Sequence, residues 1–133
     1  MGIEIDHLGI AVRSLDEALG FYAGGLGMEA GARETVEEER VHAIMLPTRD
    51  GGPCIELLEG TDGESVIAKF VEKRGPGLHH VALRVDDLAQ VSERLKSQGA
   101  RLLNEPRRGA GGHTYVFVHP SSAAGVLLEL IQK

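Results

Sequence analysis

The sequence predicts an α+β fold made of two tandem modules, each of β-α-β-β-β order. One observation is a repeated segment, because IDHLGIAV at residues 5–12 returns as HHVALRV at residues 79–85. A second is that identical residues recur 73 positions apart, which indicates one unit written twice. A third is that strand and helix patterns follow the same order in both halves. The recurring pairs are His7 and His80, Val12 and Val85, Leu15 and Leu88, Pro47 and Pro120, Gly52 and Gly125, and Glu56 and Glu129.

The length of 133 residues suits one domain of ordinary size. Each half alone would be marginally stable, so we expect the two modules to share a core. We therefore predict a single domain over residues 1–133. Its parts are a first module at about residues 2–60, a linker at 61–76 and a second module at 77–133.

The composition excludes several classes of protein. A net charge of −6 argues against a general nucleic-acid or membrane-surface role, which requires a basic face. The single cysteine, Cys54, cannot form an internal disulfide and fits a reducing compartment. The chain opens directly in a strand pattern and holds no apolar run near 18 residues. We expect a soluble cytoplasmic protein.

The first strand is predicted at residues 3–12, where aliphatic residues dominate. Alternation places His7 and small neighbours on one face, and Leu8, Ile10 and Val12 on the other. His7 is thus expected to point away from the apolar side, with room above it. Ser14 predicts the start of a helix that runs to residue 22 and is stopped by two glycines.

The remaining elements follow from local patterns. In the first half we expect a weak strand at 28–35, a solvated turn at Glu37–Glu39, and strands at 41–46 and 54–58 separated by a glycine-rich connection. In the join between the halves we expect a helix at 65–71 and a break at 75–77. In the second half we expect a strand at 78–85, a helix at 88–98, a short strand that begins at 102–103, a loop at 107–112, a strand at 114–118 and a last strand at 125–131.

Two His-Glu pairs carry the chemistry of the repeat. Glu56 lies 49 residues after His7, and Glu129 lies 49 residues after His80. A carboxylate in an apolar strand needs a partner, and a duplicated module would bring all four side chains to a common cleft. Two imidazoles and two carboxylates suit a divalent metal such as Zn, Co, Ni, Mn or Fe. The alternative interpretation is a buried His/Glu hydrogen-bond cluster.

The other candidate groups give weaker signals. His79 faces the opposite side of its strand from His80 and is expected to pack or to support the site. The run RRGAGG at 107–112 could hold phosphate through backbone N–H groups, but it lacks the spacing of a P-loop. We further expect His42 at the surface, His119 in a structural role, and no nucleophile at Cys54. His113 borders the glycine-rich loop and could reach a ligand, but this is the less favoured interpretation.

The segments IDHLGIAV, CIELLEG, GPGLHHVALRVDD and RRGAGG with the following HTYVFVHPSSAAGVLLEL resemble the vicinal oxygen chelate superfamily, also called the glyoxalase fold. Within that superfamily they are most similar to the methylmalonyl-CoA epimerase family. The resemblance runs from residue 3 to the C-terminus. It implies two tandem βαβββ modules in a glyoxalase-like fold, an acyl-CoA substrate, a divalent metal (Co, Mn, Ni or Zn) and a homodimer.

The resemblance also implies roles for individual residues. His7, Glu56, His80 and Glu129 fall on the metal-ligand positions of the family. A second acid/base, a glutamate in a Pro-Glu-Gln-Gly-Val-like stretch, falls on Glu38, although the assignment can slip to either neighbouring glutamate. The catalytic pair implied is Glu38 and Glu129. The departures from the family pattern are Glu37 for proline, Arg40 for glycine, Ser121 for lysine, and Ala124-Gly125 for a Gly-Gly pair.

The implied reaction is metal-dependent epimerisation of (2R)- and (2S)-methylmalonyl-CoA through an enolate. Two alternatives remain open at this point. One is a glyoxalase I-like lactoylglutathione lyase, which would use the same metal and the same proton-shuttle logic. The other is a non-enzymatic, bleomycin-binding-type protein that sequesters a ligand.

Overall fold

The computed structural model describes residues 2–109 and 112–133. The chain divides into two compact units. One contains His7–His79, and the other contains Met1–Asp6 together with His80–Lys133. The α+β class and the repeated β-α-β-β-β order are confirmed. None of the described helices has the length and apolar character to cross a membrane.

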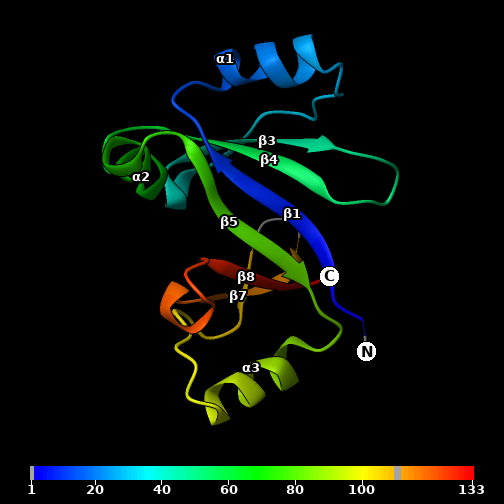
Figure 1. Ribbon diagram of the computed structural model, residues 1–133, viewed down its shortest axis with the longest axis vertical. Helices are drawn as coiled ribbons and strands as arrows, with labels where there is room; N and C mark the ends of the chain where they lie inside the picture. Colours follow the sequence, from blue (N-terminus) through cyan, green and yellow to red (C-terminus); the bar gives the residue numbers. More distant parts are fainter. Residues whose placement is uncertain (1, 110–111) are drawn as a thin grey trace. The chain divides into compact units, whose positions relative to one another are not determined.

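The sheet of the first unit has the strand order β2-β3-β4-β1, and β1 and β4 run parallel (Figure 1). The two other pairs of neighbouring strands are antiparallel. His7 of β1 lies opposite Cys54 of β4, and Gly9 lies opposite Glu56. The strands are β1 (Glu4–Ala11), β2 (Glu34–Val36), β3 (Val41–Pro47) and β4 (Cys54–Gly60).

Helices cover both faces of this sheet. On one face, Ile10 and Val12 pack in a cluster with Leu15 of the first helix. On the other face, Ala11 is fully buried against Ile67 and other residues. The helical elements of this unit are α1 (Leu15–Leu19), continued by the π-helical η1 (Gly20–Gly25), the 3-10 turn η2 (Glu37–Glu39) and α2 (Val66–Arg74). Helix α2 therefore covers the end of the β1 face on which Ala11 lies.

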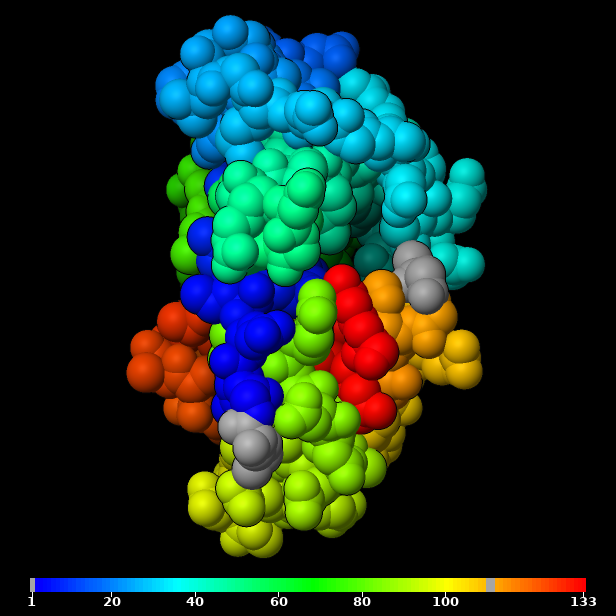
Figure 2. Space-filling model, turned by 90° about the vertical axis from the view of Figure 1, so that its right-hand side faces the viewer, coloured from blue at the N-terminus to red at the C-terminus, as the bar shows by residue number. Residues whose placement is uncertain are grey.

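The second unit repeats this plan with the strand order β5-β8-β7-β6. Strands β5 and β8 are parallel, and β8 lies beside β7 in both views (Figures 1 and 2). Its core gathers Val85, Leu88, Val116, Val118 and Leu130. The elements are β5 (Gly77–Arg84), α3 (Leu88–Ser97), β6 (Arg107–Arg108), β7 (Thr114–Val118), the 3-10 turn η4 (Pro120–Ser122) and β8 (Leu128–Gln132).

Both units start their first helix with the same hydrogen bonds. The Ser14 hydroxyl accepts from the N–H of Glu17, and the Asp87 carboxylate accepts from the N–H of Gln90. The N–H of Leu15 donates to the Glu59 carboxylate at 2.7 Å. The N–H of Leu88 donates to the Gln132 side chain, also at 2.7 Å. These side chains accept hydrogen bonds from backbone N–H groups of the first helical turn, which have no partner within the helix. The bonds from Glu59 and Gln132 also connect each helix to the last strand of its own unit.

Some boundaries differ from the sequence prediction. The strand expected at 28–35 is confined to β2, and the predicted loop at 107–112 begins with the short strand β6. The pair expected at 102–103 forms only an isolated bridge, from Leu102 to Val118. The last strand starts at Leu128 instead of residue 125, because Gly125 has a φ of +91° in the preceding turn.

Ala124 adopts the left-handed backbone conformation with φ 57°, and Gly51, at the corresponding repeat position, has φ 69°. A Cβ disfavours this conformation, whereas glycine adopts it freely. We expect Ala124→Gly to raise the free energy of unfolding by about 0.5–1 kcal/mol, since relief of strain exceeds the extra entropy of the unfolded chain. Urea unfolding midpoints measure this. Gly51→Ala is the matched opposite and should lower stability; a lower midpoint for Ala124→Gly would contradict the argument.

Candidate metal centre

In the first unit, His7 and Glu56 face each other from neighbouring parallel strands. The His7 Nε2 atom lies 3.4 Å from Glu56 Oε1, and the histidine is only 5% exposed. Gly9 lies directly opposite Glu56 and shares a strand face with His7. Because Gly9 has no side chain, the carboxylate has space to reach the imidazole.

The second unit contains the same arrangement. His80 Nε2 lies 3.4 Å from Glu129 Oε1, and His80 is 6% exposed. Ala82, another small residue, lies opposite Glu129. The ring of Phe117 packs edge-on against His80, with ring centroids 6.0 Å apart. Each unit thus holds one buried imidazole against one largely buried carboxylate.

The separation within each pair fits a shared cation. A hydrogen bond between nitrogen and oxygen normally measures about 2.7–3.2 Å, so 3.4 Å is long for direct bonding. Two ligand atoms about 2.1 Å from one ion, at angles of about 90–110°, lie about 3.0–3.4 Å apart. Imidazole nitrogen and carboxylate oxygen are also the donors that Zn, Mn, Co and Ni accept. The residues present therefore fit a divalent metal.

The glutamates of the acidic run lie on η2, between β2 and β3, and all three are exposed. This agrees with the solvated turn expected from sequence. Glu37 lines an open cavity of about 440 Å³ together with Thr35 and His42. Glu38 lies at the centre of the turn.

The remaining histidines lie outside the two pairs. His79 stacks edge-on against Phe70 at 5.0 Å, as expected for a packing residue. His119 is structural, because its Nδ1 accepts a hydrogen bond from the N–H of Ser121. His42 is half-buried and shares a 2.8 Å hydrogen bond with Thr35. Ala110 and Gly111 of the glycine-rich run lie outside the described residues, so the phosphate-loop interpretation stays a prediction.

Sequence reasoning missed Asp6, the residue before His7. Its side chain is 4% exposed and pairs with Arg84 Nη2 at 3.0 Å and with Lys133 Nζ at 2.9 Å. Two cations offset the cost of burying this carboxylate and fix the start of β1. The available signal was an acidic residue inside an apolar strand pattern, the same signal that identified Glu56.

A family model described as the glyoxalase/bleomycin resistance protein/dioxygenase superfamily matches residues 6–117. The chain belongs to this superfamily. The glyoxalase-like fold expected from the resemblance is thereby confirmed.

Relatives within the superfamily include methylmalonyl-CoA epimerases. The ethylmalonyl-CoA/methylmalonyl-CoA epimerase of Cereibacter sphaeroides is 37% identical over 131 residues, covering 96% of each chain. The crystal structure of methylmalonyl-CoA epimerase from Mycobacterium tuberculosis is 42% identical with a TM-score of 0.88, covering 97% of this chain and 87% of that one. A variant of the Streptomyces coelicolor methylmalonyl-CoA epimerase in complex with 2-nitronate-propionyl-CoA is 38% identical with a TM-score of 0.87, covering 98% and 96%. The resemblance to the epimerase family is confirmed.

Because the two His-Glu pairs have the same geometry, we expect loss of either histidine to weaken metal affinity to a similar extent. We expect His7→Ala and His80→Ala each to weaken Zn or Mn affinity by about 100-fold or more, because each removes an imidazole donor. Competition with a chelator of known affinity measures this, with circular dichroism to confirm folding. His79→Ala is the control, because it removes a neighbouring imidazole that packs on Phe70. Equal weakening by all three variants would argue against the assignment.

Proposed function

We propose that this protein is a methylmalonyl-CoA epimerase, which interconverts the (2R) and (2S) epimers of methylmalonyl-CoA. The observation that carries the proposal is the buried His-Glu pair, present in each unit with the same 3.4 Å separation. The similarity to epimerases over nearly the whole chain supports the choice of substrate. An enzyme that moves protons in this way needs carboxylates near a cation. Each His-Glu pair supplies an imidazole nitrogen and a carboxylate oxygen as donors for such a cation.

We propose that His7, Glu56, His80 and Glu129 together hold one divalent ion, Co, Mn, Ni or Zn. His7 and Glu56 form the pair of the first unit, and His80 and Glu129 form the pair of the second. When bound, the ion supplies a Lewis acid that favours the negative charge developing on the thioester oxygen. The burial of both imidazoles keeps these donors away from competing water.

The proton transfers are assigned to Glu38 and Glu129. Inversion at the α-carbon requires two groups, one on each face of the planar enolate. One carboxylate removes the α-proton while the electron pair of the C–H bond enters the enolate. The other, protonated beforehand, then returns a proton to the opposite face. Glu129 would serve as both ligand and base, whereas Glu38 stands on an exposed turn with free access to solvent protons.

The proposal includes an assembly and a location. By similarity to the superfamily, we propose a homodimer of single-domain chains that binds acyl-CoA in the cytoplasm. Sedimentation velocity on the purified protein tests the assembly, because a species of about 14.2 kDa would exclude the dimer.

The decisive experiment incubates one epimer of methylmalonyl-CoA with metal-loaded protein in D2O. We expect deuterium to enter the α-position and the opposite epimer to appear, followed by NMR and by chromatographic separation of the epimers. Chelation should abolish both processes, and metal addition should restore them. Exchange no faster than with the free metal ion would remove the epimerase assignment. Methylglyoxal with glutathione, assayed in parallel, tests the lactoylglutathione lyase alternative.

A set of three variants identifies the base on the turn. We expect Glu38→Gln to lower the epimerisation rate by about 100-fold or more with metal content unchanged, since the amide cannot accept the proton. Glu37→Gln and Glu39→Gln are matched controls that change the same charge on the same turn. If one of these controls shows the large loss instead, the base is that residue and Glu38 is not.

A further inference from the structure

Arg40 directly follows the turn that carries the three glutamates and holds an unfavourable backbone conformation. Its φ and ψ are 57° and 49°, in the left-handed region. Among the described residues other than glycine, only Arg40 and Ala124 have a positive φ. Such strain persists where surrounding contacts determine the conformation. The contacts of Arg40 therefore indicate what holds the turn.

The main chain of Arg40 is bound on both sides. Its N–H donates to the carbonyl of Glu37 at 3.1 Å and closes η2. Its carbonyl accepts from the N–H of Thr61 at 2.8 Å, in the loop after β4. The next residue, Val41, begins β3 opposite Gly60, the last residue of β4. Arg40 thus sits where the glutamate turn meets the end of β4.

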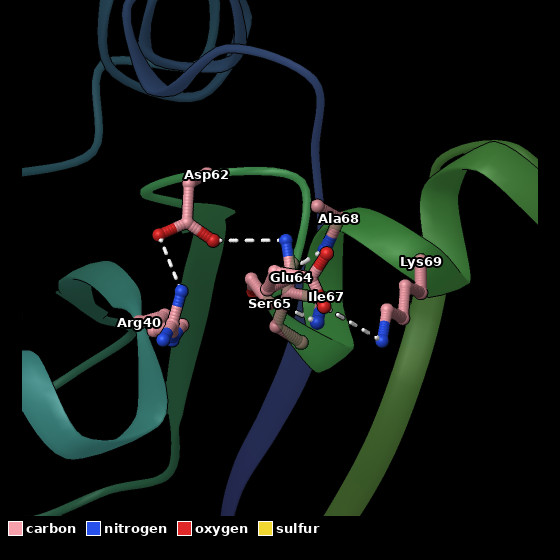
Figure 3. Close-up of polar contacts among 7 residues, drawn as sticks. All are labelled: Arg40, Asp62, Glu64, Ser65, Ile67, Ala68 and Lys69. Atoms are coloured by element: carbon pink, nitrogen blue, oxygen red, sulfur yellow. Dashed lines mark hydrogen bonds and ion pairs between the residues drawn. The ribbon is translucent and has the colours of Figure 1, made fainter.

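The side chain adds a third connection to the same loop (Figure 3). Arg40 Nη1 donates to Asp62 Oδ2 at 3.0 Å, and Asp62 Oδ1 accepts from the N–H of Glu64 at 2.8 Å. The carbonyl of Asp62 accepts from the N–H of Ser65, whose hydroxyl caps α2. Both carboxylate oxygens of Asp62 are therefore engaged, and the loop is fixed from Arg40 to the helix start.

This loop is packed firmly onto β4. A Cβ atom at Gly60 would lie 2.8 Å from Ser65 Oγ and 2.8 Å from the Ala68 Cβ, closer than normal contact. Strand β4 also carries Glu56, one of the proposed ligands. The glutamate turn is consequently connected, through Arg40 and Asp62, to the strand that bears a metal-binding carboxylate.

We propose that Arg40 is a positioning residue, which holds the Glu37–Glu39 turn, and with it the proton-transferring carboxylate, at a fixed place relative to β4. This inference rests on the proposed function. The Arg40-Asp62 pair is about half exposed, so it adds little to stability. A glycine, which the related epimerase motif has here, would relieve the backbone strain but could not reach Asp62. An arginine at this position therefore has a strained backbone, but its side chain can bind Asp62.

The two-base reaction gives this role a specific signature. The carboxylate on the turn removes the α-proton from one epimer only, and Glu129 removes it from the other. If the turn is misplaced, the first epimer loses its proton slowly. The second epimer still gives its proton to Glu129 and receives deuterium back on the same face. Exchange then continues without inversion for one epimer and falls for the other.

The experiment measures α-deuterium incorporation and inversion for each epimer separately, in D2O, with metal-loaded protein. Arg40→Gly should slow exchange of one epimer by about tenfold and leave the other within about twofold, because small displacements of a reacting group cost rate. Asp62→Asn should do the same, the double variant should lose no more than either single variant, and Arg40→Lys should recover part of the rate. Arg33→Gly is the matched control, since it breaks the exposed 2.7 Å pair with Asp16 in the same unit.

The outcomes separate the two proposals. A wild-type protein that exchanges neither epimer refutes the epimerase function, and this inference with it. An active wild type in which Arg40→Gly slows both epimers equally, or slows neither, refutes the role of Arg40 alone. The same asymmetric loss in Arg33→Gly would also refute it. Glycine at position 40 relieves strain, so thermal melting of this variant should remain close to that of the wild type.

Discussion

The structure depends on a carboxylate held against an imidazole inside a sheet, once in each unit. A carboxylate placed in an apolar strand is costly unless charge or hydrogen bonding compensates for it. Here the compensation comes from the neighbouring parallel strand, where a small residue opposite the glutamate leaves its side chain free to reach the histidine. Parallel pairing of the first and fourth strand of each copy is therefore the arrangement that makes the candidate metal centre physically acceptable.

The same strand also secures the helix that begins the copy. The side chains of Glu59 and Gln132 accept the N–H group of the first helical residue in their own units, each at 2.7 Å. Each of these acceptors lies three residues after the paired glutamate of its strand. A strand that carries a proposed ligand near its middle thus anchors the helix at its end. Local helix capping and site geometry are mechanically connected, because both depend on the position of one strand.

Much of this arrangement followed from the sequence because the duplicated residues are few in type and chemically distinctive. His7 and His80 were identifiable because β1 and β5 correspond at the repeat offset along their full lengths. The ion pairs of Asp6 could not be predicted, because its partners Arg84 and Lys133 are distant in sequence. The strained backbone of Arg40 could not be predicted either, since an arginine gives no local signal for a left-handed conformation.

The hairpins of the two units differ by one residue. Glu56 follows its cross-strand neighbour Met45 by 11 residues, whereas Glu129 follows Phe117 by 12. Side chains alternate along a strand, so a shift of one position brings a different residue to the carboxylate. The two carboxylates accordingly have different cross-strand neighbours, a flexible thioether at Met45 and an aromatic ring at Phe117. Loop length between two strands can thus change the surroundings of a buried acid, while the histidine on the parallel strand stays opposite it.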